Sequence, residues 1–145
     1  MIRKFLTGIV LLLICCHARS QGKISVRINN FESNKGSCIV CVYDNAQSFS
    51  DKGGKPLACQ TVPVTNENAT VVFDNVNQGT YAIMVIHDAN NNRKFDSNFM
   101  GIPKEGYGAS QNKLPFAAAP KFEENKFTVT GNTTTHCTIK LRYIL

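Results

Sequence analysis

Hydrophobic and polar residues alternate along short stretches of the chain, and this two-residue period predicts β-strands. In the segment 23–31, Ile24, Val26 and Ile28 alternate with polar residues, as in a strand with one buried face. The segment 135–143 shows the same alternation, and the side chains expected on its buried face are Cys137, Ile139, Leu141 and Tyr143. No stretch has helical periodicity of useful length, so we expect a chain built of strands.

Seven segments have strand-like patterns and are separated by turn residues. They are 23–31, 37–43, 57–64, 69–73, 79–87, 127–130 and 135–143. The segment 37–43 is apolar on both faces, which predicts a central strand, whereas Pro63 places 57–64 at a sheet edge because proline cannot donate to a neighbouring strand. The pattern predicts an all-β chain, a single antiparallel β-sandwich of about seven strands, immunoglobulin-like or transthyretin-like.

The first 20 residues have the three-part layout of a secretory signal peptide. A basic start at 1–4 is followed by an apolar run at 5–16 and by a small-x-small cleavage pattern at 18–20. The apolar run is shorter than the ~20 residues that a transmembrane helix needs, so we expect no transmembrane segment. We predict a signal peptide at 1–20 and a β-sandwich domain at 21–145 of an exported protein, periplasmic or secreted.

A lipoprotein anchored through Cys15 or Cys16 is the alternative. Processing of lipoproteins favours small residues just before the modified cysteine, whereas Leu12, Leu13 and Ile14 precede Cys15. Export with cleavage therefore remains the preferred interpretation, and the two cysteines are then apolar members of the signal segment.

Cleavage changes what the charge implies. It removes three basic residues and no acidic one, which halves the formal net charge of +6 to +3. The remaining lysines are scattered and form no basic block, so the sequence excludes a nucleic-acid-binding protein on charge grounds. No motif identifies a partner, and a cell-envelope protein or a carbohydrate is the expectation for an exported binding domain.

Four cysteines remain after cleavage, and outside the cytosol paired cysteines tend to form disulfides. Strand parity places Cys41 and Cys137 on inward faces. It places Cys38 and Cys59 on outward faces if the valines of 57–64 point inward. We predict the pairs Cys41–Cys137 and Cys38–Cys59. The alternative for the inner pair is two buried free thiols that pack as small apolar groups.

The segment 87–96 carries oxygen-bearing groups spaced like the ligands of a calcium loop. Asp88, Asn90, Asn92 and Asp96 occupy positions 1, 3, 5 and 9, and the carbonyl of Lys94 occupies position 7. The usual glycine at position 6 is Arg93 here, and the usual glutamate at position 12 is Phe99. We predict a weak Ca²⁺ site with an affinity of about 10⁻⁴–10⁻³ M. The alternative is a turn whose side chains bond to their own backbone.

A second loop, 101–110, holds three glycines and several polar side chains, and we expect it to fold beside the first. The candidate ligand-pocket residues are His87, Lys104, Glu105, Tyr107 and Ser110. The preferred alternative is that Glu105 and Ser110 bond to backbone groups and hold the loop in shape.

The run from Gly79 to Ser110 resembles the bacterial domain of unknown function 2141 family. The family pattern is G-x-Y-A-x-x-x-x-H-D-x-N-x-N-x-x-x-D followed by G-x-P-x-E-G-x-G-x-S. This chain carries it at Gly79, Tyr81, Ala82, His87, Asp88, Asn90, Asn92, Asp96, Gly101, Pro103, Glu105, Gly106, Gly108 and Ser110. The resemblance covers nearly all of the mature chain and implies an exported single-domain β-sandwich with no established activity. Members often carry glycine after the second asparagine, where this chain has Arg93.

The sequence favours a binding or accessory module over an enzyme. One alternative is a carrier that holds a small apolar ligand among its nine Phe and four Tyr residues. A hydrolase that uses His87, Ser110 or Glu105 is less favoured, because the chain lacks G-x-S-x-G, H-E-x-x-H and multi-histidine motifs. We expect no cofactor other than Ca²⁺.

Overall fold

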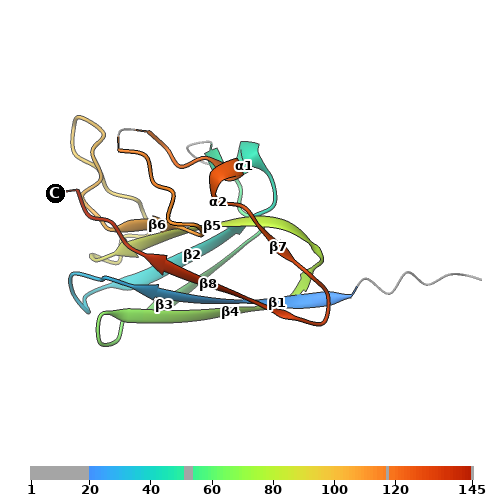
Figure 1. Cartoon of the computed structure of the whole chain (residues 1–145). Coiled ribbons are helices and arrows are strands. Elements are labelled where there is room, and N and C mark those ends of the chain that lie inside the picture. Colours follow the sequence, from blue (N-terminus) through green and yellow to red (C-terminus); the bar gives the residue numbers. More distant parts are fainter. Residues whose placement is uncertain (1–19, 51–53, 117, 145) are drawn as a thin grey trace, which may run out of the picture.

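Two β-sheets pack face to face in the computed structural model (Figure 1), which describes residues 20–50, 54–116 and 118–144. The predicted signal peptide lies outside these residues except for Ser20. The first strand begins at Gln21, the predicted first residue of the mature chain. Among the helices of the described residues, none is long and apolar enough to span a membrane.

One sheet has three strands in the order β4, β1, β8. Strand β1 (Gln21–Asn29) lies in the middle, antiparallel to β4 (Asn68–Asn77) and parallel to β8 (Thr134–Lys140). The alternation predicted from the sequence is confirmed in β1, where Ile24, Val26 and Ile28 are fully buried.

The other sheet has five antiparallel strands. Strand β3 (Ala58–Pro63) forms an edge, followed by β2 (Ser37–Tyr43), β5 (Gly79–Asp88) and β6 (Tyr107–Ala109), and β7 (Phe127–Val129) also pairs with β5. The central place of β2 and the edge place of β3 are as the sequence predicted, because β3 contains Pro63. Strand β6 falls inside a segment that the sequence assigned to a loop.

The core fills the space between the two sheets. Its largest fully buried side chains are Ile24, Ile28, Ile83, Ile139 and Leu141. The predicted fold class is confirmed, because the chain is mostly β and its two sheets pack as a largely antiparallel sandwich.

A smaller apolar cluster lies under two short helices, α1 (Ala46–Ser50) and α2 (Phe122–Asn125). Phe49 of α1 and Phe122 of α2 meet edge to face with ring centroids 5.9 Å apart, and both pack with Ala82 of β5. The second apolar face of β5 therefore has a partner of its own, which explains why this strand lacks simple alternation.

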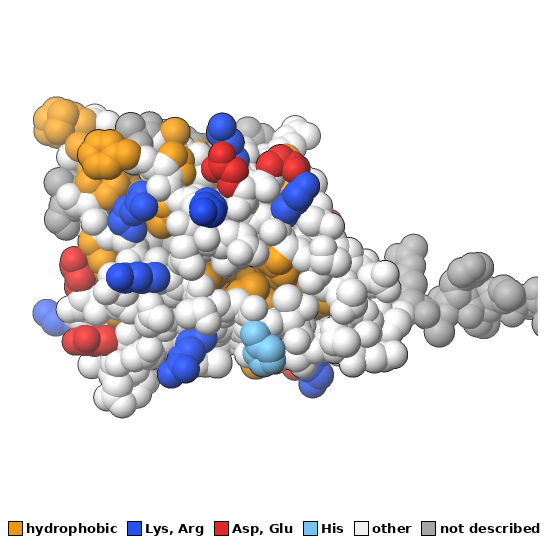
Figure 2. Space-filling view, viewed as in Figure 1, with side chains coloured by type: hydrophobic (Ala, Val, Ile, Leu, Met, Phe, Trp, Pro, Cys, Tyr) orange, Lys and Arg blue, Asp and Glu red, His pale blue; other side chains and the backbone are white. Residues whose placement is uncertain are grey.

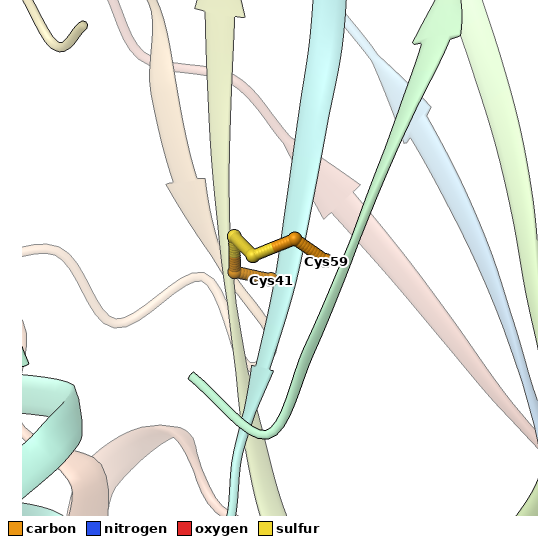
Figure 3. The surroundings of a disulfide bond; sticks show 2 residues. All are labelled: Cys41 and Cys59. Carbon is orange, nitrogen blue, oxygen red and sulfur yellow. A yellow bond between two sulfur atoms is a disulfide. The ribbon is translucent and has the colours of Figure 1, made fainter. Parts of the chain in front are cut away.

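The disulfide of this structure joins Cys41 of β2 to Cys59 of β3, with the two Cα atoms 4.2 Å apart (Figure 3). The two residues lie directly opposite each other in the antiparallel register of these strands, where side chains on one face approach closely. The predicted pairing of Cys41 with Cys137 and of Cys38 with Cys59 is therefore wrong.

The error arose from the direction assigned to β2. This strand is apolar on both faces, so its pattern alone does not tell which face meets the core. Cys38 lies on the buried face with Val40 and Val42, and Cys41 lies on the other. Cys38 and Cys137 are both buried free thiols.

Candidate functional site at the loop face

Two long connections rise over the five-stranded sheet toward the upper left of Figure 1. The first joins β5 to β6 through residues 89–106, and the second leaves β6 and reaches α2 through residues 110–121. We call residues 89–106 and 111–116 the loop face. They include both motifs singled out in the sequence.

Asp88 fixes the start of the first loop. Its side chain is fully buried, and its two carboxylate oxygens accept the backbone N–H groups of Asn92 at 3.0 Å and Arg93 at 2.8 Å. Asn91 and Arg93 take left-handed backbone angles, with φ of 56° and 60°. The turn is therefore closed by a carboxylate that satisfies backbone donors inside the protein.

Three of the five predicted metal ligands, Asn90, Asn92 and Asp96, come together through their side chains. Asp96 Oδ2 accepts the amide Nδ2 groups of Asn90 at 2.8 Å and Asn92 at 2.7 Å. The oxygens of the two amides face the backbone instead, since Asn90 Oδ1 accepts the N–H of Asn92 and Asn92 Oδ1 that of Lys94. In this arrangement Asp96 is surrounded by amide donors. The described residues contain no group of three or more His, Cys, Asp or Glu side chains placed to hold a metal ion.

Glu105 links the two ends of the first loop. It is 6% exposed, and its carboxylate accepts the N–H of Ala89 at 3.3 Å and that of Asp96 at 3.0 Å. Burial raises the pKa of Glu105, and the charges of Asp96 and Asp88 act in the same direction, whereas the two backbone bonds oppose them. This is the loop-holding role that the sequence offered as the alternative to ligand binding.

A surface hollow of about 450 Å³ lies beside this turn. Its lining is polar and consists of Ala89, Asn90, Asp96, Ser97, Lys104 and Glu105. Of the predicted pocket residues, Lys104 and Glu105 line this hollow, and His87, Tyr107 and Ser110 do not. The predicted set is thus divided between one polar hollow and the protein interior.

His87 is 2% exposed and bonds inside the protein through both ring nitrogens. Nε2 lies 2.8 Å from the carbonyl oxygen of Lys35, and Nδ1 lies 2.8 Å from the hydroxyl of Tyr143. A carbonyl only accepts, so Nε2 donates to Lys35, and a ring protonated on Nε2 alone accepts the Tyr143 hydroxyl at Nδ1. The ring also meets Phe31 edge to face at 5.0 Å.

Ser110 does not bond to His87 but to two groups elsewhere in the fold. Its hydroxyl accepts the N–H of Ile83 at 3.0 Å and donates to the carbonyl of Asn125. Ile83 and His87 are four residues apart on β5, a separation of roughly 13 Å along a strand. The Ser110–His87 pair that a hydrolase would need is therefore not formed.

Asn125 was not singled out in the sequence, yet it shapes the second loop. It is fully buried, and its amide accepts the N–H groups of Gln111 and Lys113 and donates to the carbonyls of Lys113 and Lys121. Its partners are up to 14 residues away, so local sequence pattern gave no sign of the role.

Tyr107 and Arg142 pair with each other, and each of them contacts one of the two loops. Their backbones exchange two hydrogen bonds of 3.0 and 2.8 Å. The ring of Phe95, from the first loop, lies 5.8 Å from that of Tyr107. The guanidinium of Arg142 donates to the carbonyl of Leu114, in the second loop, at 2.6 Å. Both loops are thus anchored to one pair of residues.

The first loop contains a tight hairpin turn, residues 98–102, which we call the hairpin tip. Asn98 Oδ1 accepts the N–H groups of Met100 at 2.9 Å and Ile102 at 3.0 Å, and the N–H of Gly101 bonds to the Asn98 carbonyl. Gly101 has φ of +78°, and a Cβ built there would meet no atom within 4 Å. The tip is therefore internally bonded and projects away from the rest of the chain.

Large apolar side chains stand exposed on the loop face. Phe99 is 96% exposed, Phe116 87% and Met100 64%. Figure 2 shows hydrophobic side chains gathered at the upper left of the molecule, where the two loops lie, with Lys and Arg side chains close by. The sequence reasoning missed these residues. The signal that could have found them is large apolar side chains inside Gly-, Asn- and Pro-rich segments with no strand pattern.

Comparison with known proteins gives a family but no activity. Neither the curated proteins nor the solved structures contain a match to this chain. A family model described as "Uncharacterized protein conserved in bacteria (DUF2141)" matches residues 26–137. This match includes seven of the eight strands entirely or in large part, together with both loops. The chain therefore belongs to the DUF2141 family, as the resemblance of its 79–110 segment implied.

Proposed function

We propose that this protein is an exported binding or accessory module of the cell envelope and that the loop face is its contact surface. One observation carries the proposal: Phe99 and Phe116 are 96% and 87% exposed on loops whose backbones bond to the buried side chains of Asp88, Glu105 and Asn125. The Cys41–Cys59 disulfide supports export, since such bonds persist in oxidising compartments.

Single exposed apolar residues are common on protein surfaces, but several large ones grouped on one face mark an interaction site. The loops that present them are already ordered by Asp88, Glu105 and Asn125. Binding through a pre-ordered loop loses less conformational entropy than binding through a mobile one, so this arrangement favours recognition.

Cosedimentation of the purified mature protein with a bacterial cell-envelope fraction tests the proposal. We expect the wild type to pellet with the envelope and the variant Phe99→Ser/Met100→Ser/Phe116→Ser to stay in the supernatant. The matched control is Leu57→Ser/Val72→Ser, which removes apolar side chains that are 57% and 42% exposed outside the loop face. Equal pelleting of the triple variant and the wild type would contradict the proposal.

Calcium binding in the first loop is a second proposal. The convergence of Asn90, Asn92 and Asp96 in one turn supports it. Asp88, the Lys94 carbonyl and these three side chains would hold the ion, and the two amides would have to turn their oxygens toward it. A thermal melt tests this: at about 10 mM Ca²⁺, a site of about 10⁻³ M affinity adds about 1.4 kcal/mol to the unfolding free energy. An unchanged melting temperature relative to a chelator-treated sample would reject it.

A carrier of a small apolar ligand is the remaining alternative. A hollow of about 240 Å³ lined by Val42, Leu57, Val76 and Tyr81, among others, supports it. Ligand pockets usually measure about 300–1,000 Å³, so this hollow supports a carrier less than the exposed side chains support a contact surface. That the chain is not an enzyme stays a prediction, to be checked by assaying the purified protein against generic ester and peptide substrates.

A further inference from the structure

We infer that the loop face docks on an anionic lipid bilayer, with Phe99, Met100 and Phe116 entering the interface between headgroups and acyl chains. This inference rests on the proposed function and names its partner. It follows from three features of the loop face: its exposed apolar side chains, its basic side chains that form no ion pair among the described residues, and the placing of the apolar side chains on two separate loops.

The apolar side chains sit where a bilayer could reach them first. Phe99 and Met100 occupy the hairpin tip, and the empty space around Gly101 shows that this tip projects. Phe116 lies two residues beyond Leu114, whose carbonyl is held by Arg142. Aromatic and Met side chains that project from ordered loops insert into the interfacial layer without a change of fold.

Basic side chains surround these tips. Arg93, Lys94, Lys104 and Lys113 are all exposed on the loop face. None of the four forms an ion pair among the described residues. Of the acidic groups of the same loops, Glu105 is buried and bonds to backbone N–H groups, and Asp96 is half-buried and accepts two amides, so four exposed basic side chains stand against one partly exposed carboxylate. The exposed charge of the loop face is therefore positive and complements lipid phosphates.

The shape favours a bilayer over a folded protein partner. The apolar side chains stand on two separate loops, and the longer one ends in an isolated tip. A protein partner would need a matching pocket for each tip, whereas a fluid lipid interface adapts to both. Apolar tips within a basic rim are the combination that binds anionic lipid surfaces through two additive forces.

Sedimentation with synthetic vesicles tests the inference. The mature protein should bind vesicles of phosphatidylethanolamine and phosphatidylglycerol and bind phosphatidylcholine vesicles far less. Each basic residue near an anionic surface contributes about fivefold in affinity, so Lys104→Gln/Lys113→Gln should weaken binding about thirtyfold. The control Arg27→Gln/Lys140→Gln removes two exposed charges from the three-stranded sheet and should leave binding unchanged.

A fluorescence measurement reports insertion directly. The chain has no tryptophan, so Phe99→Trp introduces a single reporter at the hairpin tip. We expect its emission to shift to shorter wavelength when anionic vesicles are added, whereas Val72→Trp, at an exposed position of β4 outside the loop face, should not respond. The Phe99→Trp melting temperature, compared with that of the wild type, verifies folding of the reporter.

Two results would overturn the inference. One is pelleting with the cell-envelope fraction without any binding to anionic vesicles, which would leave the proposed function standing with a protein or glycan partner. The other is vesicle binding that survives in Phe99→Ser/Met100→Ser/Phe116→Ser, which would show that the tips do not insert.

Discussion

The hydroxyl of Tyr143 lies 2.8 Å from Nδ1 of His87 and joins the end of the chain to strand β5 inside the protein. Burial raises the pKa of Tyr143 to about 12, so the hydroxyl stays protonated and is available as a hydrogen-bond donor to Nδ1. The same oxygen accepts the N–H of Glu32 at 3.2 Å. Tyr143 thus connects three separate segments of the fold.

Replacing Tyr143 with Phe should destabilise the protein by about 1–3 kcal/mol, because Nδ1 of buried His87 then loses its hydrogen-bond partner. Urea denaturation of both proteins measures the difference. The matched control is Tyr43→Phe, since no bond of the Tyr43 hydroxyl is found among the described residues and only a small change is expected there. Equal effects of the two substitutions would contradict the role given to the His87–Tyr143 bond.

Loss of the Cys41–Cys59 bond should cost about 3 kcal/mol, because the bond closes a segment with a sequence separation of 18. The variant Cys41→Ser/Cys59→Ser measures this by chemical denaturation. Reductant should lower the stability of the wild type toward that of the variant and leave the variant unchanged. Peptide mapping without reduction checks the pairing, and a Cys41–Cys137 fragment would contradict the structure.

The remaining two thiols should be unreactive in the folded protein. Burial raises the pKa of Cys38 to about 12 and that of Cys137 to about 11, and both side chains lie in the core. Because the thiolate is the reactive form, a thiol-specific chromogenic disulfide should label neither cysteine until denaturant is added, when both react. The variant Cys41→Ser leaves Cys59 as an exposed free thiol, which should react at once. Rapid labelling of the wild type would contradict the prediction, because it would show that the reagent reaches the thiols in the core.

For strands that are apolar on one face, the sequence predicts both the strand and the face that meets the core. For strands that are apolar on both faces, it predicts the strand but not which face meets the core. In β1, Ile24, Val26 and Ile28 alternate with polar residues, and in β8, Cys137 and Ile139 do so, so the faces followed from the sequence alone. In β2 the outward face lies near the cluster under α1 and α2, and no pattern along the chain indicated that cluster. The direction of Cys38 and Cys41 depended on this choice, and the predicted disulfides failed with it.

In the candidate site, too, contacts between residues close in sequence were predictable and contacts between distant residues were not. The turn around Asp88 was predictable because its partners lie four and five residues away. The partners of His87 lie 52 and 56 residues away, and only the tertiary fold brings them together. A spacing pattern therefore located the loop, but it could not tell whether its carboxylates meet a ligand or the backbone.

Glu105 should make stability depend on pH. Its pKa is raised above the ordinary value of 4.5, so the unfolded chain loses this proton at a lower pH than the folded protein does. Between the two pKa values the folded state holds more protons, and the contribution of Glu105 to the unfolding free energy falls as pH rises. The measurement is the unfolding free energy of the wild type minus that of Glu105→Gln, which should decrease across this range.

Arg93 occupies a position suited to glycine, and replacing it should stabilise the protein. Its φ of 60° is left-handed, a conformation that costs a residue with a Cβ about 1–2 kcal/mol and costs glycine nothing. The bond that Arg93 makes to Asp88 comes from its backbone N–H and survives the change. Arg93→Gly should therefore gain about 0.5–1 kcal/mol in urea denaturation, since glycine loses more entropy on folding.

Lys94→Gly is the control for the same loop. It removes one positive charge from the neighbouring exposed residue, but Lys94 is not among the residues with positive φ. Glycine there brings only its entropic cost, and we expect a loss of about 0.5–1 kcal/mol. Opposite signs at adjacent positions would locate the strain in the backbone of Arg93, whereas two losses would show that its side chain stabilises the turn.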